Sequence, residues 1–273
     1  MSEPVVLRGT EPLIVSIPHA GIEIPPDIEE NLVSPRLARQ DADWYVERLY
    51  NFANDLGATV IRTPVSRTVI DVNRDPSGKS LYPGQATTEL CPTTTFDGEP
   101  LYREGRVPDA QEIARRRALC FDPYHRAIEE EIARLRGRHA RVVLFDAHSI
   151  RPIVPRLFDG LLPDLNFGTN SGASCAPALT AGLETVAATS SFSRVTNGRF
   201  KGGYITRHYA NPEDGVHTFQ LELSMRAYLG DQPAKLAPEN WPPPMPPDDA
   251  VPVRALLARL LQACIDFAHK DAS

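Results

Sequence analysis

Residues 142–149 have the sequence Val-Val-Leu-Phe-Asp-Ala-His-Ser, an apolar run that ends in a short histidine signature. Residues 13–21 follow the same plan with Leu-Ile-Val-Ser-Ile-Pro-His-Ala-Gly. Short apolar runs rich in β-branched residues are typical of strands buried in an α/β sheet. Side chains at the carboxyl ends of such strands face a shared crevice. The two segments therefore predict an α/β fold that brings His19 and His148 together.

Length and composition favour one globular domain over residues 1–273, since a chain of 273 residues can bury a sizeable core. Hydrophobic residues make up 42% and charged residues 23%, as in ordinary soluble proteins. No apolar run approaches the roughly 18 residues of a membrane span. The net charge is −6, and no cluster of basic and aromatic residues offers a nucleic-acid surface. We therefore expect a small-molecule partner, with neither a membrane nor a nucleic acid involved.

The four cysteines are scattered, with no short interval typical of a zinc ribbon or a redox pair. They are Cys91, Cys120, Cys175 and Cys264. The amino terminus lacks the basic and apolar regions of a secretory signal. We expect reduced thiols and a cytoplasmic protein.

Periodicity in the first part of the chain continues the α/β pattern. Residues 41–56 have apolar residues near helical spacing, and Gly57 follows them as a helix stop. Residues 58–61 and 68–73 have the composition of strands. Residues 75–107 are rich in Gly, Pro and Thr and predict a long irregular segment, which we expect near the functional site.

The second part of the chain predicts helices, a late strand and a linker. The helical pattern of residues 108–139 is interrupted near Pro123, because proline lacks the amide donor that a helix needs. Eight of the 26 prolines cluster in a connector over residues 233–252. The other expected elements are a helix over 171–187, a strand over 217–224 and a closing helix over 253–268.

Two histidines at strand ends suggest a metal site, because neutral imidazole is a common zinc ligand. A catalytic zinc site needs a third protein ligand, and the spacing leaves both Glu23 and Asp43 open for this role. Asp146 shares a strand face with His148 and could orient that ring or bind the metal itself. The alternative is a buried hydrogen bond between Asp146 and His148 without any metal.

Charged residues elsewhere suggest an anionic substrate. Arg67 and Arg74 flank the 68–73 segment, and a planar guanidinium matches the geometry of a carboxylate, although surface ion pairs would explain them too. Lys201 and Arg207 lie in a segment with two glycines that could cover a substrate, and we expect one of them to help Arg74 bind the substrate carboxylates. Glu222 is an acid among core-like residues of the 217–224 strand, which makes it a candidate general base.

Ten short motifs between about residues 12 and 230, in the expected order, resemble the N-formylglutamate amidohydrolase family. They are Pro18–Gly21, Asp43-Trp44, Ser66-Arg67, Ile70–Arg74, Asp146–Ser149, Phe158–Gly160, Gly168–Ser174, Asn197–Gly203, Thr206–Tyr209 and Gln220–Leu223. The resemblance implies a three-layer, zinc-exopeptidase-like α/β fold with a mixed central sheet. It also implies a deformylase activity that releases formate and L-glutamate, with one divalent metal ion, Zn²⁺, as cofactor.

The resemblance further implies roles for single residues. His19 and His148 would be metal ligands, and Glu222 would be the general base. Asn73 and Arg74 would bind a substrate carboxylate, while Arg67 would polarise the carbonyl. The related carboxypeptidases have a glutamate three residues after the first histidine, where this chain has Ile22, so Asp43 is favoured over Glu23 as the carboxylate ligand.

Two other functions fit the same residues. Another N-acyl amino acid deacylase or a carboxypeptidase-like amidohydrolase would use the same metal chemistry with a larger acyl pocket. A non-catalytic carboxylate-binding protein would use the arginines for its ligand and the histidines for structure.

Overall fold

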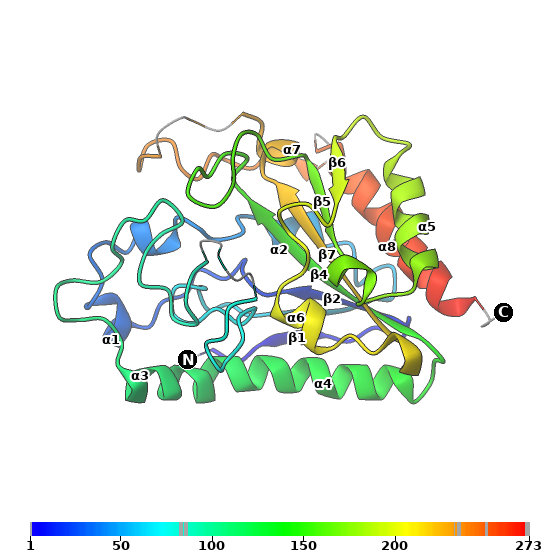
Figure 1. Cartoon of the computed structure of the whole chain (residues 1–273), viewed down its shortest axis with the longest axis horizontal. Helices are drawn as coiled ribbons and strands as arrows, with labels where there is room; N and C mark the ends of the chain where they lie inside the picture. Colours follow the sequence, from blue (N-terminus) through cyan, green and yellow to red (C-terminus); the bar gives the residue numbers. More distant parts are fainter. Residues whose placement is uncertain are drawn as a thin grey trace.

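The structure, a computed structural model, describes residues 2–81, 84, 87–231, 233, 236–248 and 251–270. Its strands form one mixed sheet in the order β1-β3-β2-β4-β7-β5-β6 (Figure 1). The strands are β1 Val5–Leu7, β2 Leu13–Ile17, β3 Thr59–Arg62, β4 Val142–Ile150, β5 Leu165–Gly168, β6 Arg194–Thr196 and β7 Val216–Ser224. β1 runs antiparallel to β3 and β5 antiparallel to β7, while the other neighbours are parallel. The prediction of an α/β fold with a mixed sheet is confirmed.

Helices cover both faces of this sheet. The α-helices are α1 Pro26–Glu29, α2 Val46–Leu49, α3 Ala110–Arg116, α4 Asp122–Arg136, α5 Pro177–Ala187, α6 Tyr204–His208, α7 Arg226–Leu229 and α8 Val253–His269. α4 packs against β2, β3 and β4 on one face, whereas α8, with α5 beside it, packs on the opposite face (Figure 1). None of the helices in the described ranges is long and apolar enough to cross a membrane.

The two predicted central strands are buried on both faces, as parallel strands between helical layers must be. In β4, Val143 and Phe145 face the α5 and α8 side, whereas Val142 and Leu144 face α4. β2 matches the predicted residues 13–17, but β4 continues to Ile150 beyond the predicted apolar run. Because of this extension, the histidine signature lies within β4 and its side chains keep the alternation of the strand.

Two expectations for the first part of the chain were wrong. Residues 41–56 contain only the four-residue helix α2, which follows Tyr45 in a left-handed conformation with φ of 64°. Residues 68–73 form turns, because Asp71 Oδ1 accepts a hydrogen bond from the backbone of Asn73 in place of a strand partner. Short polar side chains often compete with a strand ladder in this way. The strand expected over 58–61 is present as β3.

Most expectations for the second part are confirmed. A π-helical turn over Arg117–Phe121 separates α3 from α4, and Pro123 lies in the first turn of α4, where its missing amide is harmless. β7 and α8 appear within a residue of their expected bounds. The helix expected over 171–187 starts later, at Pro177, after a 3-10 turn over Asn170–Gly172 that Thr169 caps. Residues 232, 234, 235, 249 and 250 of the chain around the proline-rich connector lie outside the described residues.

The long segment 75–107 is irregular, as expected, in the part that the structure describes, which leaves out residues 82, 83, 85 and 86. The turn that precedes it, residues 70–74, is held against α4 by His125. His125 Nε2 lies 2.8 Å from the carbonyl oxygen of Val72, and Nδ1 lies 2.7 Å from the hydroxyl of Tyr209. A neutral ring protonated at Nε2 satisfies both contacts. Burial lowers the pKa of His125 to about 4.

This contact predicts a pH dependence of stability. An unfolded chain returns the pKa of His125 to near 6.5, so unfolding takes up a proton between this pH and about 4. The contribution of the neutral ring is complete above pH 6.5 and is lost as the pH falls, by about 3 kcal/mol in the free energy of unfolding. We expect His125→Gln to flatten this pH dependence in denaturant unfolding. Equal pH dependence in variant and wild type would contradict the assignment.

Candidate functional site

The site lies where the carboxyl ends of β2, β4 and β7 meet, the usual place for a ligand in an α/β sheet. β4 and β7 are parallel neighbours, and their register places His148 beside Glu222 and Asp146 beside Gln220. All four side chains are on the face of the sheet that α6 covers. The alternation of side chains along β4 and β7 therefore places these four residues in the site.

His19 reaches the same point from the loop after β2. Gly21 lies so close to the 63–64 backbone that a Cβ atom would come within 2.4 Å of Pro64, so only glycine fits. The backbone amide of Asp43 donates to the carbonyl oxygen of His19 at 3.0 Å. This backbone contact brings the 40–43 turn beside the histidine loop.

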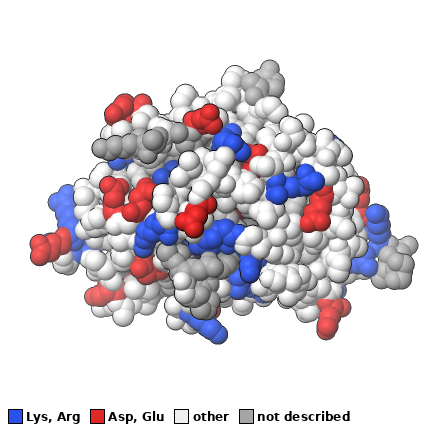
Figure 2. Space-filling model, turned by 45° about the horizontal axis from the view of Figure 1, so that its top comes forward, with Lys and Arg blue, Asp and Glu red and all other residues white. Residues whose placement is uncertain are grey.

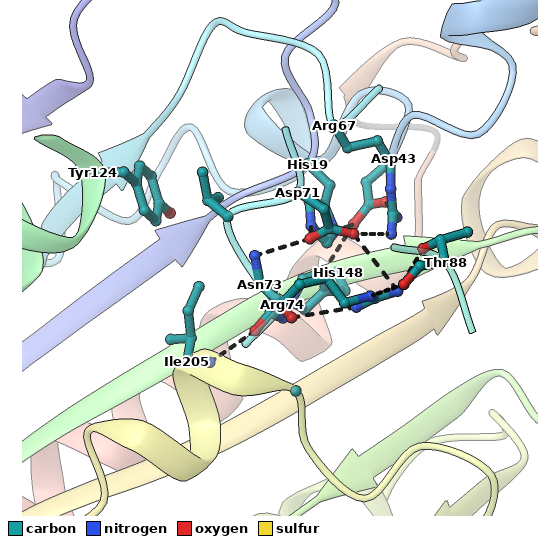
Figure 3. A network of polar contacts seen from close by, with 12 residues as sticks. His19, Asp43, Arg67, Asp71, Asn73, Arg74, Thr88, Tyr124, His148 and Ile205 are labelled. Carbon is teal, nitrogen blue, oxygen red and sulfur yellow. Dashed lines mark hydrogen bonds and ion pairs between the residues drawn. The ribbon is translucent and has the colours of Figure 1, made fainter. Parts of the chain in front are cut away.

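His19, Asp43 and His148 converge in one buried cluster (Figure 3). One ligand atom from each of the three lies within 4.8 Å of the others, and the two ring centroids are 4.8 Å apart. Oδ2 of Asp43 lies 3.0 Å from His148 Nδ1 and 3.8 Å from His19 Nδ1. The Nδ1 atoms of both rings therefore face the same carboxylate.

A second carboxylate stands behind each ring. His19 Nε2 lies 2.7 Å from Asp71, and His148 Nε2 lies 3.0 Å from Asp146. Asp146 also accepts a hydrogen bond from Ser16. Of the two roles left open for Asp146, these contacts fit ring orientation. Carboxylates that back imidazoles in this way fix the tautomer and make the ring a better metal ligand.

Burial and charge act differently on the two histidines. Burial, together with the charge of Arg67, lowers the pKa of His19, so this ring is neutral. Burial also disfavours a charged His148, but the Asp146 and Asp43 carboxylates raise its pKa well above the usual value. The same carboxylates would also attract a metal cation, which binds an imidazole lone pair in competition with the proton.

The cluster fits a divalent cation. His19 Nδ1 is buried and has no hydrogen-bond partner among the described residues, although it points toward Asp43. An unpartnered buried nitrogen is costly, and a metal ion would satisfy it. Two imidazoles and one carboxylate are a common ligand set of catalytic zinc sites.

The other ligand candidate, Glu23, lies outside the cluster. It is exposed and accepts a hydrogen bond from Ser2. Backbone pairing with residues 64–66 holds Glu23 away from the two rings. The geometry therefore favours Asp43.

Glu222 is buried beside His148 and faces the cavity. Its carboxylate lies 3.3 Å from the side-chain amide of Gln220, which in turn accepts a hydrogen bond from the backbone of Gly203. Burial raises the pKa of Glu222 to about 8. A carboxyl group with such a pKa can both accept and release a proton near neutrality.

The predicted arginines surround Asp71. Arg67 Nη2 donates to Asp71 at 2.7 Å, and its Nη1 lies 3.5 Å from Asp43. Arg74 Nη2 lies 3.6 Å from Asp71 and donates to the Thr88 hydroxyl (Figure 3). Burial opposes ionisation of Asp71, but Arg74, His19 and Arg67 hold its pKa well below the usual range.

Asn73 has a different set of contacts from the one expected. Its Oδ1 accepts from the amide of Ile205, and its Nδ2 lies 3.1 Å from Asp146 and 2.9 Å from His148. Asn73 lines the cavity, yet its polar atoms hold α6 and the ring of His148 in place. Its role in carboxylate binding stays a prediction.

A cavity of about 560 Å³ opens beside the cluster. Its basic lining residues are Arg67, Arg74, Lys79 and Arg199. The predicted binders Lys201 and Arg207 do not line it: Lys201 is exposed, and Arg207 donates to backbone carbonyls of Gly202 and Leu81. On the face shown in Figure 2, basic and acidic side chains are interspersed.

Some members of the site have no clear signal in the sequence. Asp71 belongs to a motif singled out above, but nothing in the spacing pairs it with His19. Phe96 and Arg199 reach the cavity from irregular segments, where no periodicity predicts a direction. Gln220 could have been found, because alternation in β7 places it on the same face as Glu222.

Comparisons with known proteins identify the family of the chain. A family profile described as FGase, N-formylglutamate amidohydrolase, matches residues 11–229. The chain is 49% identical to the N-formylglutamate deformylase of Pseudomonas aeruginosa over 264 residues, which cover 96% of each protein. It is 44% identical to the N-formylglutamate deformylase of Pseudomonas putida over 259 residues, or 94% of each.

Solved structures confirm the fold. The crystal structure of an N-formylglutamate amidohydrolase from Ralstonia eutropha JMP134 superposes with a TM-score of 0.77 at 22% identity, covering 98% of this chain and 97% of that one. A gene product of Agrobacterium tumefaciens gives a TM-score of 0.70 at 17% identity, covering 97% and 94%. The fold, the buried cluster and these matches together define an amidohydrolase. Within that class, the chain belongs to the N-formylglutamate amidohydrolase family.

The cluster leads to a prediction about metal binding. We expect the wild-type protein to retain zinc when it is purified without chelator, and Asp43→Ala to lose most of it, because Asp43 Oδ2 faces both Nδ1 atoms. Asp71→Asn should lower metal affinity by roughly 10–100-fold, as expected for a residue that orients a ligand. Metal analysis and titration of the apoprotein measure both effects.

Glu23→Ala is the matched control, since it removes the other carboxylate that the sequence offered. It should retain zinc at the wild-type level. Loss of zinc from Glu23→Ala together with its retention in Asp43→Ala would show that the cluster is not the metal site.

Proposed function

We propose that this protein hydrolyses N-formyl-L-glutamate to formate and L-glutamate, with one Zn²⁺ held by His19, Asp43 and His148. The observation that carries the proposal is the position of Glu222 beside this ligand set, at the wall of a cavity that Arg67, Arg74 and Arg199 also line. Its closely similar relatives, named as deformylases, support the choice of substrate.

The metal ion and the base have separate tasks. When bound, a divalent cation supplies Lewis acidity, which makes water more acidic and the formyl carbonyl more electrophilic. Glu222 takes a proton from the water that attacks the formyl carbon. It then delivers this proton to the nitrogen of glutamate as the C–N bond breaks, leaving formate and a free amine.

Arg67 stabilises the negative charge that develops on the formyl oxygen. Its guanidinium is buried and is fixed by Asp71 and Asp43, so it needs little rearrangement during the reaction. A preorganised donor of this kind is worth about 10²–10³ in kcat.

The remaining basic residues bind the two carboxylates of the substrate. Arg74 is within the cavity near Asp71, and Arg199 comes from a different wall, where its Nε donates to the carbonyl oxygen of Leu157 at 2.6 Å. That contact orients the plane of the Arg199 guanidinium. We assign one substrate carboxylate to Arg74 and the other to Arg199.

Three broader expectations belong to the same proposal. The helical layers on both faces of a mixed sheet are consistent with a zinc-exopeptidase-like fold. We also propose that residues 1–273 form a single catalytic domain, and that the enzyme works in the cytoplasm.

Replacement of the base tests the mechanism. We expect Glu222→Gln to bind zinc normally but to lose about 10²–10⁴-fold in kcat for formate release, because the amide cannot accept the proton of water. Formate and L-glutamate are quantified in parallel with the metal content.

The control is the wild-type protein with N-acetyl-L-glutamate, which should be turned over negligibly. Efficient deacetylation would favour a broader deacylase. If wild-type protein that contains zinc binds N-formyl-L-glutamate but releases no formate, the result would favour a non-catalytic carboxylate-binding protein.

Substitutions of Arg199 and Lys201 test which of these two residues binds a substrate carboxylate. We expect Arg199→Met to raise KM for N-formyl-L-glutamate by about 10–100-fold with kcat nearly unchanged, because a charged hydrogen bond to the substrate is lost. Steady-state kinetics measure this split. Lys201→Met is the matched control and should have wild-type constants; an equal rise in KM for Lys201→Met alone would transfer the role to Lys201.

A further inference from the structure

The guanidinium of Arg67 is covered by an aromatic ring from the long irregular segment. Arg67 Cζ lies 4.8 Å from the ring centroid of Phe96, a distance typical of a cation–π contact. Phe96 is only 6% exposed and lines the cavity. The Phe96 ring therefore restricts the movement of the Arg67 guanidinium on one side.

A tight turn over residues 95–98 presents this ring. The amide of Gly98 donates to the carbonyl oxygen of Thr95, and Gly98 has a φ of 90°, which favours glycine. The amide of Phe96 donates to Asp41 Oδ2 at 2.7 Å. The position of the ring thus depends on the carboxylate of Asp41.

Arg151 connects this turn to the metal-ligand segment. It directly follows the last residue of β4, the strand that carries His148. Its Nη2 lies 2.9 Å from Asp97 Oδ2 and 3.4 Å from Asp41 Oδ1, and the Arg151 side chain is 9% exposed. Gln40 adds a hydrogen bond to the same oxygen of Asp97 at 3.2 Å.

The charges of Arg151 and its two carboxylate partners also affect Arg67. Asp41 and Asp97 share Arg151 as their cation, while Asp41 also attracts Arg67 electrostatically. Without Arg151, the buried carboxylate of Asp41 would lose its nearest cation, and the acceptor of the Phe96 amide would no longer be held in place. A buried carboxylate that loses its partner is strongly destabilised until it takes up a proton or another cation reaches it, and either change alters the contacts that hold the turn.

We propose that Arg151 is a positioning residue: it holds the 95–98 turn through Asp41 and Asp97, and thereby holds Phe96 against Arg67 in the geometry that the reaction needs. The positioning of the turn stands on the contacts alone, whereas its kinetic consequence rests on the proposed hydrolysis. An error of about 1 Å in a group that acts in the transition state can cost roughly 10²-fold in rate.

Hydrogen exchange and crystallography test the positioning without any substrate. We expect Arg151→Met to accelerate exchange of the Phe96 amide and to lengthen the distance from Arg67 to the Phe96 ring. Arg151→Lys should preserve both, because a single nitrogen reaches both carboxylates in the structure. Unchanged exchange and an unchanged distance in Arg151→Met would overturn the proposal.

Arg156→Met is the matched control. Arg156 is an exposed arginine that donates to the carbonyl oxygen of Thr95 in the same turn, but it contacts neither carboxylate in the described contacts. It should leave the Phe96 amide protected. Acceleration equal to that of Arg151→Met would show that loss of any charge beside the turn suffices, which would overturn the proposal.

Kinetics test the link to Arg67. We expect Arg151→Met to lower kcat for formate release by about 30-fold with KM within about threefold, and Arg151→Lys to recover most of the loss. In an Arg67→Met background the same change should have little further effect, because the two residues act through one group. Fully additive losses would show that Arg151 does not act through Arg67.

A second variant covers the case in which Arg151→Met does not fold. Asp97→Ala alters a side chain that is 34% exposed and removes the closer contact of Arg151. It should show the same accelerated exchange and the same non-additivity with Arg67→Met, and wild-type behaviour in both would overturn the proposal. Absence of formate release from the wild-type protein would refute the proposed function alone, since exchange and distance would still decide the positioning.

Discussion

The pairing of each buried imidazole with its own carboxylate is the interaction on which the site depends. Asp71 and Asp146 bond to the Nε2 atoms of His19 and His148, so both Nδ1 atoms must face Asp43. This arrangement concentrates acids in a region of low dielectric, where unpaired charges are costly. Arg67 and Arg74 beside Asp71 compensate part of this negative charge, and a cation held by the cluster would compensate more of it.

The sequence predicted the centre of the sheet well and its surroundings less well. Apolar runs such as residues 13–17 are buried on both faces, so composition alone identifies them. The 68–73 segment has the composition of a strand but folds into turns, because the side chain of Asp71 supplies a local acceptor that periodicity cannot register. The break in the expected 41–56 helix depends on a left-handed Tyr45, which no residue pattern foretells.

The candidate site was predictable where it follows strands. Alternation places His148 and Glu222 on predictable faces of their strands, whereas the register of β4 with β7 that brings them together comes from the structure. Asp43 was predicted as the carboxylate ligand from the family resemblance, since the spacing alone did not exclude Glu23. The cavity wall was not predictable, because Phe96 and Arg199 owe their directions to contacts with distant residues such as Asp41 and Leu157.

The order of the strands also governs when the site can exist. Among the described residues β7 is the last strand in sequence, yet it lies between β4 and β5, so the two parts of the sheet made earlier join through it. During synthesis on the ribosome, Glu222, the proposed proton acceptor, is therefore made with the strand that joins these two parts. A nascent chain that has not yet made β7 contains both imidazoles but lacks Glu222, so the site is complete only once this strand has paired with β4.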